Sequence, residues 1–207
     1  MAEGRSEASP DETRSAAEPD ETRPTWDDAY LDEVAGRLET SYDLEPDYPV
    51  EGTGWALYGE LVLKREKYFL HPTLSYGQHD SDEHLLARRV ETVDSSRLDS
   101  LVDLGHRLAD EWVVPDERHY STEFTFVLVV PEITDPVADY VDGFRDRTLL
   151  KYGYFGHYEV NLVVVAPETE TLVASEQADV AAAFRTWGAP PARERGLFGR
   201  LADAIFE

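Results

Sequence analysis

The residues best suited to chemistry form an alternating polar row, His157, Glu159 and Asn161. In an extended strand these three side chains share one face, and the apolar residues between them lie on the other. A histidine can bind a metal ion or accept a proton near neutral pH, and a neighbouring carboxylate can orient it or share a divalent ion. The row predicts a ligand site, a site for a metal of unknown identity, or a proton relay. The alternative is the ordinary polar end of an exposed strand.

Two known catalytic patterns lie close to this row. The zinc deaminases combine His-x-Glu with cysteine ligands, which this chain cannot supply because it contains no cysteine. Restriction-type nucleases place Glu-x-Lys on a central strand after a metal-binding aspartate, whereas the third position here is Asn161. We therefore keep a metal-dependent hydrolase, of the phosphodiesterase or nuclease kind, as the alternative function and assign no catalytic residue.

A second polar cluster occupies residues 79–84, which read His-Asp-Ser-Asp-Glu-His, with His71 eight residues upstream of His79. The run offers five oxygen or nitrogen ligands, but its spacing matches no known zinc finger or calcium-binding loop. The alternative is a solvated loop, because acidic residues are frequent throughout this chain.

Four aromatic residues and two glycines fall within residues 152–158. The rings of Tyr152, Tyr154, Phe155 and Tyr158 could stack a planar ligand, and the glycines would admit it closely. The alternative is a hairpin whose rings cover one end of the core. The sequence holds no glycine-rich phosphate loop, nucleophile elbow or dinucleotide motif, so no cofactor is expected.

The chain is strongly acidic, with 43 Asp and Glu residues against 19 Lys and Arg residues and a formal net charge of -24. Such a surface repels a phosphate backbone, so we expect no nucleic-acid partner. Without cysteine, disulfides, thiolate ligands and a cysteine nucleophile are excluded. The sequence shows no signal peptide and no apolar run of about 18 residues, which predicts a cytoplasmic protein.

Periodicity predicts the elements that position these residues. Helices are expected at 25–38, 94–112, 135–144 and 175–187, with Thr25, Asp94 and Ser175 as N-caps and Pro136 in a first turn. Strands are expected at 55–63, 68–76, 85–93, 124–130, 158–165 and 172–174. A Pro- and Gly-containing loop precedes the first strand, and residues 64–67 form a turn between the first two.

The order of these elements predicts one α+β domain over residues 25–188, with about four helices on a mixed, mostly antiparallel sheet. Residues 124–130 are apolar on both faces, so this strand and the strand at 158–165 are expected to be central. Residues 1–24 repeat the pentapeptide Pro-Asp-Glu-Thr-Arg and predict a disordered acidic leader.

The C-terminal segment, residues 189–207, departs from the acidic composition. Behind Pro190 and Pro191 it carries as many arginines as acids and forms an amphipathic helix with the apolar stripe Leu197, Phe198, Leu201, Ile205 and Phe206. A helix this short is marginal alone, so it is expected to dock on its own domain, a second copy, a partner groove or a membrane interface. We expect a non-catalytic binding or assembly module that uses this helix, with a protein partner or self-association, or with peripheral membrane contact.

The composition and the run from Tyr154 to Pro167 resemble an uncharacterised protein family, a domain of unknown function, of halophilic archaea. Strong acidity combines with only three lysines, Lys64, Lys67 and Lys151, among the 19 basic residues. The resemblance implies a salt-rich cytoplasm, where screening weakens the repulsion between surface acids. It implies no activity and no site residues.

Overall fold

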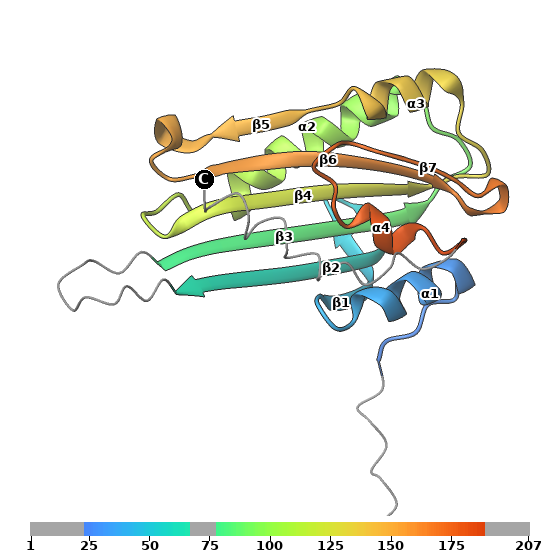
Figure 1. Cartoon of the computed structure of the whole chain (residues 1–207), viewed down its shortest axis with the longest axis horizontal. Coiled ribbons are helices and arrows are strands. Elements are labelled where there is room, and N and C mark those ends of the chain that lie inside the picture. The colour runs from blue at the N-terminus through green and yellow to red at the C-terminus, as the bar shows by residue number, and fades with distance from the viewer. Residues whose placement is uncertain (1–22, 67–77, 189–207) are drawn as a thin grey trace, which may run out of the picture.

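The computed structural model describes residues 23–66 and 78–188 of the chain, and within these ranges seven strands form one mixed sheet with helices on both faces (Figure 1). The strands are β1 (Asp43–Val50), β2 (Thr53–Glu66), β3 (Gln78–Arg89), β4 (His119–Val129), β5 (Asp146–Leu149), β6 (His157–Ala166) and β7 (Thr171–Ala174). The helices are α1 (Ala29–Leu38), α2 (Ser95–Trp112), α3 (Asp135–Asp142) and α4 (Ala181–Phe184), with short 3-10 turns η1 (Leu150–Gly153) and η2 (Pro167–Thr169).

The sheet order is β1-β2-β3-β4-β6-β5, and β7 also pairs with β6. The three inner strands β3, β4 and β6 run parallel to one another, and every other pairing is antiparallel. The α+β class, the mixed sheet and the central position of residues 124–130 and 158–165 are therefore confirmed. α2 connects β3 to β4 across one face, as a parallel connection requires.

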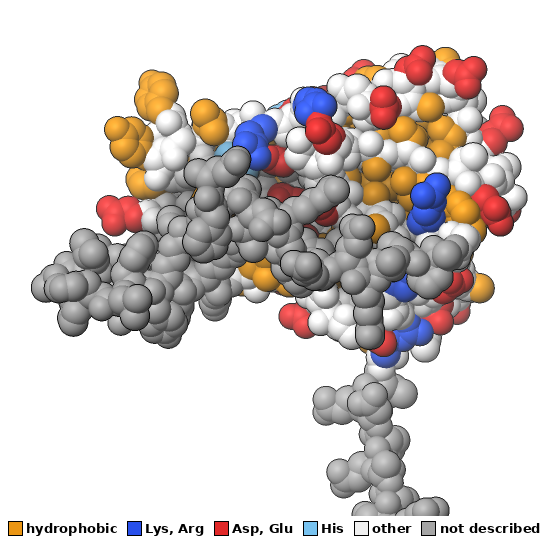
Figure 2. Space-filling model, viewed as in Figure 1, with side chains coloured by type: hydrophobic (Ala, Val, Ile, Leu, Met, Phe, Trp, Pro, Cys, Tyr) orange, Lys and Arg blue, Asp and Glu red, His pale blue; other side chains and the backbone are white. Residues whose placement is uncertain are grey.

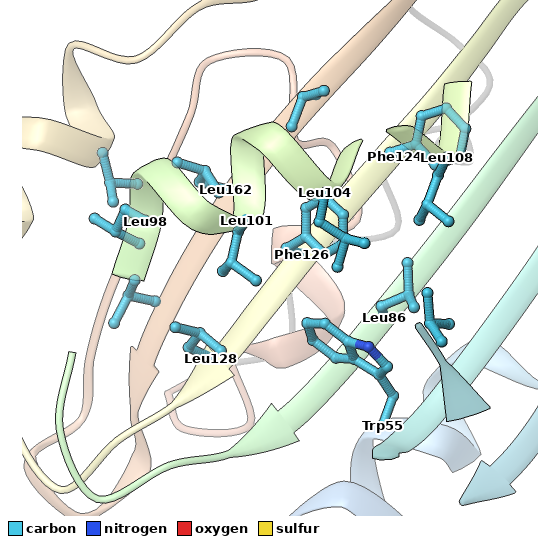
Figure 3. Packing of buried hydrophobic residues seen from close by; sticks show 14 of the residues in the cluster. Trp55, Leu86, Leu98, Leu101, Leu104, Leu108, Phe124, Phe126, Leu128 and Leu162 are labelled. Carbon is cyan, nitrogen blue, oxygen red and sulfur yellow. The ribbon is translucent and has the colours of Figure 1, made fainter. Parts of the chain in front are cut away.

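One face of the sheet packs on α2 and α3. Asp94 caps α2 as predicted, since its carboxylate accepts a hydrogen bond from the Arg97 amide at 2.8 Å. A stripe of leucines on α2 points toward Trp55 and Phe126 of the sheet (Figure 3). A Cβ at Gly105 would lie 2.6 Å from a Val160 methyl carbon, so glycine is what lets this helix approach β6 so closely.

The other face packs on α1 and α4, which lie on the opposite side of the sheet from α2 (Figure 1). Tyr30 of α1 donates a hydrogen bond to the Phe184 carbonyl oxygen of α4 at 2.5 Å, and Trp26 donates one to the Ala56 carbonyl oxygen at 2.6 Å. These helices contact the carboxyl-terminal halves of the parallel strands, at buried residues such as Val127. The amino-terminal halves of the same strands carry polar side chains instead.

Several predicted strand boundaries were wrong. The expected loop before residue 55 contains β1, which tolerates Pro46 and Pro49 because it is an edge strand. The expected turn at residues 64–67 is wrong for 64–66, because β2 continues through Glu66. Residues 79–84 form the start of β3 and not a loop, so the strand predicted at 85–93 begins earlier and ends at Arg89. The strand predicted at 68–76 lies outside the described residues, and β5 was not predicted.

Two helix starts also differ from the prediction. Asp28, not Thr25, caps α1, accepting from the Tyr30 and Leu31 amides. Ser175 does not cap a helix, because its hydroxyl accepts from the Leu162 amide at 3.1 Å, and α4 is a single turn. The third predicted helix is confirmed, since α3 opens with Asp135 and a proline. In the two described ranges, every helix is too short or too polar to cross a membrane.

Candidate functional site

A row of three glutamates crosses the sheet on the side of α1 and α4. Glu83 of β3 is paired in register with Glu123 of β4, and Glu123 with Glu159 of β6. Because neighbouring strands lie about 4.8 Å apart, these side chains stand beside one another. Farther along the same strands the face becomes apolar, with Leu85 on β3 and Val127 on β4. We call the polar half of this surface, which carries the three glutamates, the carboxylate face.

Arg147 and His157 hold one end of the row. Arg147 of β5 lies opposite Glu159 in register and forms an ion pair with its carboxylate. The Nε2 atom of His157 lies 3.3 Å from the same Glu159 oxygen. Burial alone would raise the pKa of Glu159, but the hydrogen bonds and charges of His157 and Arg147 outweigh it and hold that pKa below its ordinary value. Glu159 is therefore a neutralised anion.

Tyr42 holds the other end of the row. Its hydroxyl donates a hydrogen bond of 2.5 Å to the Glu83 carboxylate. Burial raises the pKa of Glu83, the Tyr42 bond opposes this, and the charge of Asp179 adds to it. Burial also raises the pKa of Tyr42, so its hydroxyl remains a donor over the physiological range.

Glu123 lies in the middle of the row, between two other carboxylates. Burial, together with the charges of Glu83, Glu159 and Asp179, raises the pKa of Glu123 to about 8, and the charge of Arg147 opposes this rise. Within the described ranges no donor or cation pairs with this carboxyl group. At neutral pH it is mostly protonated, and an added cation would favour its ionised form.

Asn161 adds an unused hydrogen-bond donor to the carboxylate face. Only 2% of the residue is exposed, its Oδ1 accepts from the Ser175 hydroxyl at 3.3 Å, and its Nδ2 has no hydrogen-bond partner among the residues that the structure describes. Ser175 follows β7, which pairs with β6, and Asn161 lies two residues from Glu159 on the same face of β6. A buried donor without an acceptor costs about 1–3 kcal/mol, which a ligand carrying an acceptor would recover.

The predicted row of His157, Glu159 and Asn161 does share one face, and His157 contacts Glu159, but the three side chains do not meet at one point. Residues two apart along a strand are separated by about 6.6 Å, so His157 and Asn161 lie about 13 Å apart. The backbone of Glu159 lies nearer to that of Glu123, its partner on the neighbouring strand at about 4.8 Å, than to that of His157 or Asn161 on its own strand. The described parts of the chain hold no group of three His, Asp or Glu side chains close enough to bind one metal ion.

The structure separates the aromatic residues of 152–158. Tyr152 is 96% exposed and Tyr154 is 86% exposed, and hydrophobic side chains project around β5 and η1 in Figure 2. Tyr158 is buried on the α2 side of β6, where its hydroxyl lies 2.9 Å from Nδ1 of His106. Phe155 contributes its carbonyl oxygen to His119. These rings therefore do not form one stacking surface.

The cluster at 79–84 is divided between the two faces of β3. Glu83 joins the carboxylate face, while Asp80 and Asp82 line a hollow of about 200 Å³ at the end of α2. His84 also lies on the α2 side, 2.9 Å from the Tyr58 hydroxyl, and burial lowers its pKa to about 4. It is therefore a neutral core residue, and His71 lies outside the described residues.

Sequence reasoning missed Glu123, Tyr42 and Arg147, and it included Glu83 only as one possible ligand in the polar run at residues 79–84. A signal for the row exists, because in its first half each of the three parallel strands carries a small or polar residue followed two positions later by glutamate. The pairs are Ser81 and Glu83, Ser121 and Glu123, and His157 and Glu159.

Comparison with known proteins places the described domain in one family. No curated protein and no solved structure matches the chain significantly. Residues 27–186 match a domain of unknown function, DUF8052, and this match covers both helix-packed faces of the sheet and the carboxylate face. The chain belongs to the DUF8052 family.

Proposed function

We propose that this protein is a non-catalytic binding module that holds a cationic group, a guanidinium or an ammonium, on the carboxylate face. The observation that carries the proposal is the register of Glu83, Glu123 and Glu159, which leaves the middle carboxyl without a cation among the described residues. Burying neighbouring carboxylates costs free energy unless a cation neutralises them. A bound cation would lower that cost at Glu123.

The chemistry of the face favours a guanidinium carried by a peptide. A planar guanidinium can donate to two carboxylates on neighbouring strands at once. It has no acceptor, however, and the Nδ2 donor of Asn161 needs one. A peptide carbonyl next to an arginine side chain supplies both groups, so an arginine-containing segment fits the face better than a free amine.

The row His157, Glu159 and Asn161 supports metal-dependent hydrolysis less well. The Glu159 carboxylate already accepts from Arg147 and His157, and Asn161 is one step removed along the strand. We therefore assign these residues to ligand binding, with Glu159 positioned by its two partners.

The test is a titration with three probes, followed by amide NMR. The probes are acetyl-Gly-Arg-Gly-amide, the same peptide with uncharged citrulline, and agmatine, which has the guanidinium but no peptide carbonyl. We expect affinity to fall in the order arginine peptide, agmatine, citrulline peptide. Because binding displaces the proton of Glu123, affinity should rise about tenfold between pH 6 and pH 7.

The matched variants are Glu123→Gln, in the row, and Glu111→Gln, at an exposed position of α2. Binding should be lost in the first and kept in the second. Equal binding to both variants, or no difference between arginine and citrulline peptides, would refute the proposed function.

We also propose that the protein works in concentrated salt in the cytoplasm, on the strength of its net charge of -24. Raising KCl from about 0.15 M to about 1 M shortens the Debye length from about 8 Å to about 3 Å and screens surface repulsion. The thermal unfolding midpoint should rise over this range. An unchanged or lower midpoint would contradict the proposal.

A further inference from the structure

The carboxylate face has more anions than the described chain neutralises. The charges of Glu83 and Glu159 both act on Glu123, and Arg147, the cation that opposes them, already forms an ion pair with Glu159. His157 lies beside the same glutamate. The carboxyl group in the middle of the row therefore lacks a cation from the described residues, and a cation from elsewhere could pair with it.

The sequence contains an arginine-bearing segment that departs from the acidic composition of the chain. Residues 193–207 hold three arginines and three acids and are neutral, although the chain as a whole carries a charge of -24. Arg193, Arg195 and Arg200 lie close together in a chain where acids outnumber basic residues by 43 to 19. Charge complementarity thus favours this segment over the rest of the chain.

The described chain ends on the correct side of the sheet for such an arrangement. Phe184 of α4 is buried against the α1 side, and Trp187 packs on the same cluster. Gly188 is the last described residue, so an extended chain would carry Arg193 up to about 17 Å and Arg200 up to about 41 Å from it. The row itself spans two strand spacings, or about 10 Å.

Asn161 provides an observation independent of charge. Its buried Nδ2 lacks an acceptor, and a guanidinium or a metal ion cannot supply one. A polypeptide segment crossing the face would bring backbone carbonyl oxygens together with its arginines. The unpaired amide and the carboxylate row therefore indicate the same kind of occupant.

We propose that residues 189–207 dock on the carboxylate face of their own chain, with Arg193, Arg195 and Arg200 supplying its cations. The segment then acts as a tethered competitor that an external arginine-bearing ligand must displace. This inference rests on the proposed function, because both use the same surface. It commits to the same chain as the source of the segment, in place of a second copy, a partner groove or a membrane.

The first test uses the absence of cysteine in the natural chain. An Ala192→Cys variant of the full chain carries a spin label at that single thiol. We expect the label to broaden amide signals of residues 81–83, 121–123 and 157–159 and to spare α2, on the far side of the sheet. Broadening centred on α2, or equal broadening everywhere, would overturn the inference.

Isotope mixing separates docking within one chain from exchange between copies. Spin-labelled chain without ¹⁵N is mixed with unlabelled ¹⁵N chain, and the inference predicts no broadening in this mixture. Broadening of the carboxylate face in the mixture would show that a second copy supplies the segment and would overturn the inference.

The second test replaces the three arginines by glutamine in the full chain. Because a short tether gives a millimolar effective concentration, removing the competitor should strengthen binding of acetyl-Gly-Arg-Gly-amide at least about fivefold. The control variant is Arg97→Gln with Arg118→Gln, on exposed positions away from the face, which should leave the affinity unchanged.

The two proposals can fail separately. If the probe binds through Glu123 with equal affinity in the natural chain and the triple variant, the inference fails and the proposed function stands. If the spin label localises to the carboxylate face while no probe binds the triple variant, the inference stands and binding of an external ligand is refuted.

Discussion

The two faces of the sheet differ, although the same strands form both: the α2 face is mostly apolar, and the α1 face is half polar. On the α2 side β4 presents Phe124, Phe126 and Leu128, all without solvent exposure. On the α1 side the same strand presents Glu123 and Thr125 before it becomes apolar toward its carboxyl end. One face is a conventional packed core, and the other is a core for only half of its length.

The difference shows where this fold gives up stability. Buried apolar surface contributes about 25 cal/mol per Å², whereas buried carboxylates cost free energy unless they are paired. Replacing the row by leucines and valines would extend the α1 core, and residues that lower stability in this way are typical of functional surfaces. The contrast between the faces can be tested by variants on each.

The largest effect is expected on the α2 face. Phe126→Ala removes a fully buried ring that lies 5.6 Å from the Trp55 ring, between centroids, and should lower the free energy of unfolding by about 3–5 kcal/mol. Urea unfolding measures this change. Val114→Ala is the control, because Val114 is 74% exposed and the loss should be below about 0.5 kcal/mol. A loss of less than about 1 kcal/mol at Phe126 would show that this face is not the main core.

On the carboxylate face, Glu123→Gln is expected to raise the free energy of unfolding instead of lowering it. The folded state binds the Glu123 proton more tightly than the unfolded state, because the pKa is about 8 against an ordinary value near 4.5. The free energy of unfolding therefore falls as the pH rises from about 4.5 to about 8, and glutamine, which cannot ionise, avoids this loss. Because Glu123 is only half-buried and solvent screens part of this effect, the variant should be about 2 kcal/mol more stable at pH 9 and nearly unchanged at pH 4.5.

This comparison is best made in the variant that lacks Arg193, Arg195 and Arg200, since a docked arginine would offset the charge of Glu123. In the natural chain the same substitution should stabilise less. Glu111→Gln, at an exposed position of α2, is the matched control and should leave the free energy of unfolding nearly unchanged. Destabilisation by Glu123→Gln at pH 9 in the arginine-free variant would mean that its carboxylate is already paired in the fold.

A smaller loss of stability is expected when Arg147, the ion-pair partner of Glu159, is replaced. The Glu159 side chain is 4% exposed but that of Arg147 is 58% exposed, so solvent screens part of the interaction. Arg147→Gln should cost about 1–2 kcal/mol near pH 7, and the double variant with Glu159→Gln should recover most of it. Because the pKa of Glu159 is lowered in the fold, its stabilisation is present above the ordinary pKa and is lost as the pH falls below it. An equal cost at pH 3 and pH 7 would rule out an ionic origin.

The α2 face was largely predictable from the sequence, because local patterns specify it. Asp94 and the leucine spacing define α2, and apolar residues on both faces of 124–130 identify a central strand. The polar row of β6 was also predictable as one face of a strand. In each case the signal lies within one element.

The carboxylate face was not predictable in the same way, because it depends on register between strands. Glu83, Glu123 and Glu159 are about 40 residues apart along the chain, and the small or polar residue two positions before each of them does not by itself reveal that the strands align them. β1 was missed because Pro46 and Pro49 are typical of loops and are tolerated only at an edge. The polar residues at the start of β3 are typical of a loop in sequence, because they are divided between the two faces of the strand and leave neither face apolar.

The smallest effect tests whether the far end of the row is also a binding surface or only a support. Tyr42→Phe removes the 2.5 Å hydrogen bond to Glu83 and should cost about 1 kcal/mol in urea unfolding, since Glu83 is buried and loses a donor. Tyr152→Phe, at a residue 96% exposed, should cost nothing and serves as the control. If Glu83 shares a bound cation with Glu123, the loss of the Tyr42 bond frees a lone pair for that cation, and arginine-peptide affinity should hold or rise while stability falls. A parallel loss of stability and affinity would instead make Tyr42 a positioning residue for Glu83 and would extend the site to the α1 end of the sheet.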